Sequence, residues 1–268
     1  MNPALHLALF LAAIGAAILG VMMLLLWRLQ QRLRNAGYVD IGWAYGLGIL
    51  GILYAWLGQG NAVRRWALAA MVLVWSLRLG THLLKRIAGH PEEGRYVELR
   101  KKWRKSASWK FLIFFEAQAV LDVLLSLPLL LVCVDASDTA LGPWQWSGIA
   151  LWLIAVAGES LADAQLAAFK RRARPGEVCR NGLWNYSRHP NYFFEWLVWM
   201  GWAIFAITSP WGWLGFASPA LMLLFLFRVT GIPATEAQSL RSKGDAYRAY
   251  QRTTSAFFPW PHRQKGKS

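Results

Sequence analysis

Acidic residues and cysteines are scarce in this chain. Its 268 residues include 14 Asp and Glu and two Cys, and charged residues make up only 16%, well below the roughly 25% of soluble domains. Two cysteines exclude a disulfide-rich scaffold. His and Cys do not cluster at zinc-site spacing, so no metal site is predicted. Serine-nucleophile and P-loop motifs are also missing, as are repeats and low-complexity stretches.

Apolar residues are abundant instead, at 56% of the chain, and there are 17 Trp. Seven apolar segments have about the length that crosses a bilayer, and Trp suits the membrane–water interface. We therefore expect an all-α, polytopic integral membrane helix bundle with about seven transmembrane helices, forming a single membrane domain over residues 1–268. The expected spans are about 4–27, 38–58, 66–84, 111–134, 145–168, 191–208 and 213–230, followed by a cytoplasmic tail, 231–268.

Basic residues gather in alternate loops. Of 29 Lys and Arg, nine lie in 85–110, six in 170–190, eight from Arg228 onward and three after the first segment, whereas the intervening loops carry only Arg64 and Arg65. The positive-inside rule then predicts an external N-terminus and a cytoplasmic C-terminus. On this topology Cys133 and Cys179 lie on opposite sides and cannot pair. The first segment is too long for a signal-peptide core, so we expect a retained helix.

The net charge of +15 is compatible with nucleic-acid binding or with loops beside anionic lipid. The charge lies between apolar segments and no nucleic-acid module is present, so we expect no nucleic-acid partner. Gly46, Gly48 and Gly51 spell a dinucleotide-type G-x-G-x-x-G motif. They lie inside an apolar segment without a preceding strand, so helix packing is the better interpretation.

Ionisable groups at membrane depth are costly and are candidates for function. Two interpretations apply, a structural network of ion pairs and a working site. The functional one is stronger for Glu159 and Asp163, which are i,i+4 neighbours followed at once by basic residues. The acids concerned are Asp40, Glu116, Asp122, Glu159, Asp163 and Glu195.

The densest polar cluster covers residues 185–195. Pro190 suits the first turn of a helix, which predicts a helix beginning at about His189. Its N-terminus, beside Arg188 and His189, would form an anion site on the basic side. An interfacial anchor would explain Arg188 but not Asn191 and Glu195, which share a face inside the same helix.

Two further segments are polar. The first is a helix over about 233–251, followed by an aromatic segment that ends at Trp260. This part of the chain either folds back under the bundle or anchors on the membrane surface. In the loop 90–104, Glu92 and Glu93 are expected to pair with Arg95 or Arg100.

Residues 182–195 resemble the signature of the steroid 5-alpha-reductase C-terminal-domain family (3-oxo-5-alpha-steroid 4-dehydrogenase-like), in particular its uncharacterised bacterial branch. Three other segments fit that branch, and the resemblance covers roughly residues 35–260. The matching residues are Val39, Asp40 and Trp43; Trp75, Arg78, Leu79, Glu93, Arg95 and Tyr96; and Tyr247, Tyr250, Thr254, Ser255, Phe257 and Pro259.

The resemblance implies a membrane-embedded reductase that uses NADPH to saturate a carbon–carbon double bond in a steroid-like or isoprenoid enone. It implies the bacterial inner membrane, with the N-terminus periplasmic and the cofactor on the cytoplasmic side. Catalytic roles are implied for Glu195 and Tyr192. Cofactor-binding roles are implied for Asp163, Arg171, Arg188, His189, Asn191, Tyr247 and Tyr250.

The first two apolar segments lack the Gln-Glu pair that steroid reductases use near the steroid carbonyl, which disfavours a steroid. Two other function classes stay open. One is an S-adenosylmethionine-dependent membrane methyltransferase of the isoprenylcysteine carboxyl or phospholipid type, which shares an Arg-His-Pro-x-Tyr element. The other is a non-enzymatic membrane component. The reductase is favoured by the segments that contain Asp40, Trp43, Tyr247, Tyr250 and Pro259.

Overall fold

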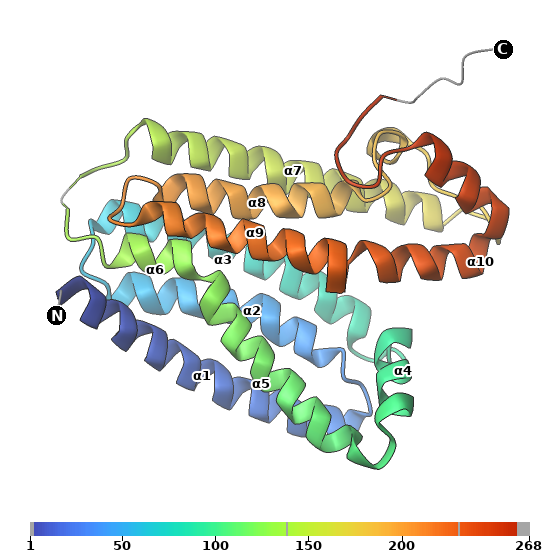
Figure 1. The fold of residues 1–268 in the computed structure, drawn as a ribbon, viewed down its shortest axis with the longest axis horizontal. Coiled ribbons are helices and arrows are strands. Elements are labelled where there is room, and N and C mark those ends of the chain that lie inside the picture. Colours follow the sequence, from blue (N-terminus) through green and yellow to red (C-terminus); the bar gives the residue numbers. More distant parts are fainter. Residues whose placement is uncertain (1–2, 138, 230, 262–268) are drawn as a thin grey trace. The chain divides into compact units, whose positions relative to one another are not determined.

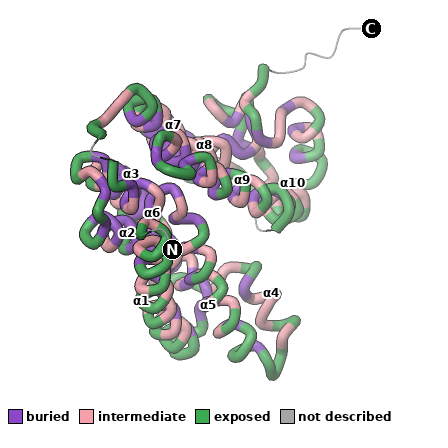
Figure 2. Tube along the Cα trace, turned by 60° about the vertical axis from the view of Figure 1, so that its left-hand side comes forward, coloured by how far each residue is buried: buried purple, intermediate pink, exposed green. Residues whose placement is uncertain are grey.

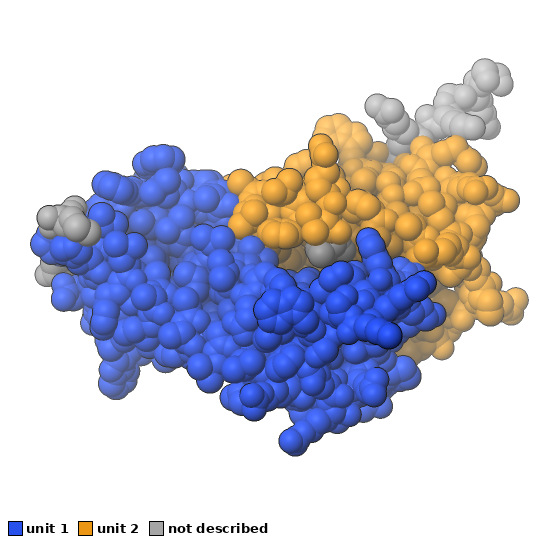
Figure 3. All heavy atoms as spheres, turned by 60° about the horizontal axis from the view of Figure 1, so that its bottom comes forward, with its two compact units in different colours: residues 1–146, 205–218 blue, residues 147–204, 219–268 orange. Residues whose placement is uncertain are grey.

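The computed structural model describes residues 3–137, 139–229 and 231–261, and within these ranges it contains helices and no strand (Figure 1). The chain divides into two compact units, coloured separately in Figure 3. Unit 1 is Met1–Trp146 with Phe205–Ser218, and unit 2 is Ser147–Ile204 with Pro219–Ser268. The end of the predicted tail, 262–268, lies outside the described residues. The predicted all-α fold is confirmed.

Five helical stretches are long and apolar enough to cross a membrane, and a bent pair of helices makes a sixth if it is one span. The five are α1 (Pro3–Leu33), α2 (Tyr38–Leu57), α3 (Ala62–Ile87), α7 (Pro143–Lys170) and the run Gly212–Thr253. The remaining predicted segment is α8 (Pro190–Ala206), whose 17 residues are at the short end of the spanning range.

The predicted segment 111–134 is two helices rather than one. α5 (Ala107–Leu125) and α6 (Leu127–Cys133) meet at an angle of 47°. Pro128 lies in the first turn of α6, and because proline cannot donate to the preceding turn it favours a new helix start there. The basic loop also holds a helix that the sequence pattern did not predict, α4 (Gly94–Trp103), followed by the short 3-10 helix η1 (Arg104–Ser106).

The last apolar run is irregular. It contains the 3-10 helix η3 (Gly212–Phe216), α9 (Ala217–Leu224) and the π-helical turn η4 (Phe225–Val229), and it leads into the polar α10 (Ile232–Thr253). α10 is kinked at Gly244, whose φ of 52° and ψ of −126° suit glycine alone. The basic-side loop before α8 holds a further 3-10 helix, η2 (Gly182–Asn185).

Small residues bring the helices of each unit together. In unit 1 an added Cβ on Gly46 would lie 2.5 Å from Asp122 Oδ2, and one on Gly48 would lie 2.4 Å from Ser76 Oγ. This confirms that the glycine motif of α2 serves packing. In unit 2 a Cβ on Gly158 of α7 would lie 2.4 Å from the Phe194 ring of α8. α1 is exposed or half-buried along most of its length (Figure 2), as expected of a lipid-facing helix.

A buried ion pair closes the weakly charged end of unit 1. Arg64, only 2% exposed, donates from Nη1 to Asp135 Oδ2 at 2.9 Å. Its guanidinium also donates to the hydroxyls of Thr139, Thr208 and Ser209, each at 3.0 Å. Arg65 donates to the carbonyl oxygens of Ala55 and Gly58, at 2.6 and 2.5 Å. Both cations of the weakly charged loops therefore have partners within the protein.

We predict that Arg64→Ala lowers the stability of the detergent-solubilised protein by about 3 kcal/mol, because it leaves the buried Asp135 carboxylate without its counter-charge. The double variant Arg64→Ala/Asp135→Ala should lose clearly less than the sum of the two single variants. Thermal unfolding of all four proteins measures this coupling. Strict additivity would show that the pair does not act as a unit.

Candidate functional site

The candidate site lies in unit 2, around the start of α8. α8 begins at Pro190, one residue after the predicted position. Ser187 Oγ accepts a hydrogen bond from His189 N at 3.1 Å and donates one to Phe257 O at 2.8 Å. The hydroxyl thus fixes the chain just before the helix and joins it to the tail.

The tail folds back along this segment. Arg188 N donates to Ser255 O at 2.8 Å, and Ser187 forms a parallel bridge with Ser255. Trp260 N donates to Tyr186 O at 3.0 Å. Phe257 is buried beside Leu226 and Ile232. The structure therefore shows the fold-back, while the exposed Phe258 and Trp260 keep the aromatic character of a surface anchor.

Arg188 is engaged within the protein. Its Nε donates to Glu236 Oε1 at 2.6 Å, and its Nη1 donates to the carbonyl oxygens of Thr254 at 2.6 Å and Gln251 at 3.1 Å. Its side chain is 11% exposed. The guanidinium thus links the α8 start to α10 and the tail.

Glu236 gathers three partners. Besides Arg188, His189 Nε2 lies 3.3 Å from its Oε1, and Gln251 Nε2 donates to its Oε2 at 2.8 Å. Burial alone would raise the pKa of Glu236, but the hydrogen bonds from His189, Arg188 and Gln251 and the charge of Arg188 lower it to about 2. The carboxylate is therefore ionised at neutral pH and orients the His189 ring.

His189 and Tyr192 form a stacked pair. Their ring centroids lie 5.3 Å apart with planes 7° from parallel. The Tyr192 hydroxyl lies 3.2 Å from Thr235 Oγ1, and His189 is 3% exposed. A phenol and an imidazole, both able to exchange protons, thus lie side by side at the basic end of α8.

A second polar pair joins α8 to α7. Asn191 Nδ2 donates to Asp163 Oδ1 at 3.3 Å. One turn further along α8, the Glu195 Oε1 atom accepts a hydrogen bond from Trp199 Nε1 at 3.0 Å, and Glu195 is 9% exposed. Glu159, on the same face of α7 as Asp163, is 4% exposed. Asp163 and Asn191, which were both predicted to bind the cofactor, are therefore in contact.

The remaining predicted residues lie at the edge of this cluster. The Tyr250 hydroxyl donates to Trp184 O and, at 3.1 Å, to Ser187 O, so it supports the loop before α8. Tyr247 is buried, 5.8 Å from Tyr250 between ring centroids. Burial raises the pKa of Tyr247 to about 12, so its phenol is neutral at neutral pH. Arg171 is exposed in the turn after α7.

Two members of the cluster had no assigned role in the sequence. Glu236 and Gln251 lie far along the chain from the α8 start, 48 and 63 residues from Arg188. One signal was available for Glu236, since it is one of two acids in an otherwise basic tail. Gln251 carries no such signal.

Unit 1 has its own polar cluster at the end predicted to be cytoplasmic. Tyr96 donates to Asp40 Oδ1 at 2.9 Å, and Arg95 forms an ion pair with the same carboxylate. Glu92 bonds Arg100 at 2.8 Å, and Glu93 lies 3.5 Å from Arg95. The expected pairing of the two glutamates is confirmed. These bonds hold α4 against the start of α2.

No group of three His, Cys, Asp or Glu residues in the described ranges is arranged to hold a metal ion.

Comparison with known proteins shows a match between residues 26–254 and the family described as "Protein of unknown function (DUF1295)". The chain is also similar to "Uncharacterized protein C594.04c" of Schizosaccharomyces pombe. The two are 27% identical over 272 residues, which cover 87% of this chain and 75% of the yeast protein. No solved structure shows a significant match.

We predict that the stability contributed by Glu236 falls as the pH drops from about 4.5 to about 2, because its pKa is lower in the folded than in the unfolded protein. The contribution is fully present above pH 4.5. Glu236→Gln should lower the free energy of unfolding by about 2 kcal/mol at neutral pH, where the charged hydrogen bonds of the parent protein are intact. Between about pH 4.5 and about pH 2 the variant should lose less stability than the parent protein does.

The matched control is Asp245→Asn, because Asp245 is exposed and pairs with the exposed Arg248. Thermal unfolding of the three proteins in detergent from pH 2 to 7 measures the effect. Parallel pH profiles for Glu236→Gln and the parent protein would refute the assignment.

Proposed function

Because the chain belongs to the family described as "Protein of unknown function (DUF1295)", which is related to steroid reductase-like enzymes, we propose that it is a membrane-embedded reductase. It reduces a carbon–carbon double bond of a lipid enone and takes its hydride from NADPH. The observation that carries this proposal is the polar cluster at the basic end of unit 2. His189, Tyr192, Asp163 and Asn191 lie there at the start of a helix.

The residues present fit a phosphate-bearing dinucleotide. α8 begins at Pro190 and presents the positive end of its dipole to this cluster. The surroundings are basic, because Lys170 ends α7 and Arg171 and Arg172 follow it directly. Asn191 offers an amide and Tyr192 a phenol beside this helix start. Such a combination of helix N-terminus, cations and neutral donors suits pyrophosphate and ribose groups.

NADPH would supply the hydride, and the protein supplies orientation, charge and a proton. Asn191, held by Asp163, and the exposed Arg171 are the residues proposed to contact the cofactor directly. Arg188 acts differently, since its Nε and Nη1 donors are used by Glu236, Gln251 and Thr254. We assign it the role of holding the tail, which carries Tyr247 and Tyr250, at the site.

Reduction of an enone adds a hydride to one alkene carbon and a proton to the other. Tyr192 is the proposed proton donor, because its hydroxyl lies beside Thr235 and its ring stacks on His189. The Glu236 carboxylate keeps the Nε2–H tautomer of His189 favoured. Glu195, oriented by the Trp199 indole, is proposed to polarise the substrate carbonyl when protonated.

We predict that the detergent-purified full-length protein binds NADPH and that S-adenosylmethionine does not compete. Both are anionic or polar nucleotide-derived ligands, so the comparison is direct. Isothermal titration with each ligand makes the measurement. Binding of S-adenosylmethionine with no binding of NADPH would replace the proposal by the methyltransferase.

Two variants locate the site in the same titration. Asn191→Ala should weaken NADPH binding at least tenfold, through the loss of the Asn191 amide and the exposure of Asp163 to the ligand phosphates. Gln238→Ala, at an exposed position of α10, is the matched control and should bind as the parent protein does. Unchanged affinity of Asn191→Ala would place the cofactor elsewhere.

A further inference from the structure

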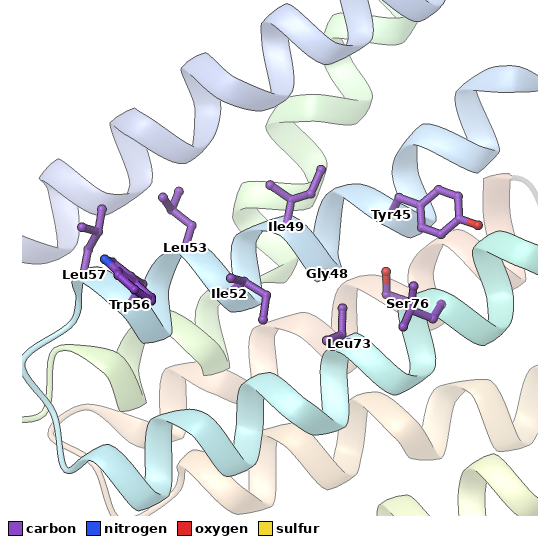
Figure 4. A pocket seen from close by; sticks show the side chains of 10 residues that line it. Tyr45, Gly48, Ile49, Ile52, Leu53, Trp56, Leu57, Leu73 and Ser76 are labelled. Carbon is purple, nitrogen blue, oxygen red and sulfur yellow. The ribbon is translucent and has the colours of Figure 1, made fainter.

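A groove with a volume of about 630 Å³ runs along α2 and α3 within unit 1 (Figure 4). α2 lines it from Tyr45 to Leu57, and α3 contributes Leu73, Ser76 and Leu77. Its volume falls in the roughly 300–1,000 Å³ range of small-molecule sites. The polar cluster of unit 2 contributes no residue to it.

The floor of the groove is a close helix contact. Gly48 lies over Ser76, and a Cβ at Gly48 would come within 2.4 Å of Ser76 Oγ. That hydroxyl donates to Ala44 O at 2.7 Å, so it is satisfied inside the helix pair. The backbones therefore meet beneath the groove, while Ile52 and Leu73 stand on either side of it (Figure 4). The hollow follows from side-chain size and persists as long as α2 and α3 stay packed.

The lining of the groove is uncharged and therefore favours an uncharged occupant. None of the lining residues is Asp, Glu, Lys, Arg or His. Ile49, Ile52 and Trp56 at its opening are 38%, 37% and 74% exposed. Both helices are apolar enough to span the membrane, so this opening faces hydrocarbon. A carboxylate or phosphate would lose its hydration there without gaining a partner, whereas a hydrocarbon chain is complementary.

The groove has a polar end and an apolar end. The Tyr45 hydroxyl lies 3.2 Å from Thr81 Oγ1, and the Tyr45 ring covers Gly80, where a Cβ would come within 2.6 Å. From Tyr45 to Leu57 the helix rises about 18 Å, slightly more than the roughly 15 Å of one leaflet of hydrocarbon. One extended chain fills that length with its polar group beside Tyr45, which lies about 10 Å along α2 from Tyr38.

The geometry points to a binding site for a neutral single-chain lipid. Its hydrocarbon chain lies along α2 from Ile49 to Leu57, and its carbonyl accepts a hydrogen bond from the Tyr45 hydroxyl. Occupancy follows from the groove itself and does not depend on the proposed reductase function, because Tyr192 and Glu195, the residues proposed for that chemistry, belong to unit 2 and do not line the groove.

Photolabelling of the full-length protein in detergent tests the site without depending on turnover. The probe is a 2-cyclohexenone with a 14-carbon chain that ends in an alkyl diazirine, and labelled residues are mapped by mass spectrometry. We expect saturable labelling near Trp56 and Leu57 that an excess of the unlabelled analogue removes. Ile52→Trp, which fills the groove, should reduce this labelling at least fivefold.

Leu25→Trp is the matched control, because Leu25 is a 61% exposed position of α1 outside the groove, and it should label as the parent protein does. Unsaturable labelling spread evenly over the exposed faces of α1, α2 and α7 would overturn the site and identify the groove as ordinary lipid-facing surface. Equal labelling of Ile52→Trp and the parent protein would also overturn it.

NADPH titration of the same preparations separates the two claims. Saturable groove labelling in a protein that fails to bind NADPH would uphold the lipid site and reject the reductase. Intact NADPH binding with diffuse labelling would reject the lipid site alone.

Discussion

The interaction on which unit 2 depends is the pairing of Arg188 with Glu236. One guanidinium bonds the Glu236 carboxylate near the start of α10 and two carbonyls at its end, so both ends of α10 are tied to the start of α8. A cation placed there without these partners would repel the neighbouring basic loops. With them, the charge is neutralised, the tail is held, and His189 and Tyr192 keep one arrangement. The proposed chemistry depends on that arrangement because proton transfer requires fixed donors.

Unit 1 also depends on buried polar side chains that have partners. Polar side chains in an apolar bundle need partners, and the Arg64 cluster and the Asp40 cluster supply them at the two ends of α2 and α3. Between these clusters the helices pack through glycines and leave an apolar groove. The polar ends thus hold a hydrocarbon-lined surface in place.

Hydropathy and loop charge predicted the helices well, because both are local properties of the sequence. Pro190 likewise predicted the start of α8, since proline favours the first turn of a helix. The bend between α5 and α6 was missed because Ser126 and Pro128 lie inside a segment whose length and overall hydropathy fit a single membrane span. The partners of Arg188 were missed for another reason. Glu236 is 48 residues away, and the basic residues of the loops offer many equivalent partners until the tail folds back. Among the predicted site residues, the structure brings together Asp163 with Asn191 and His189 with Tyr192, while Arg171 stays apart.

The most direct test of the account follows hydride itself. Full-length protein in detergent is incubated with NADPH deuterated at the transferable position of its nicotinamide ring and with a long-chain enone, and the lipid is analysed by mass spectrometry. The account predicts a saturated ketone that carries one deuterium at the carbon β to the carbonyl. Recovery of unreacted enone from a protein that binds NADPH and the lipid would contradict it.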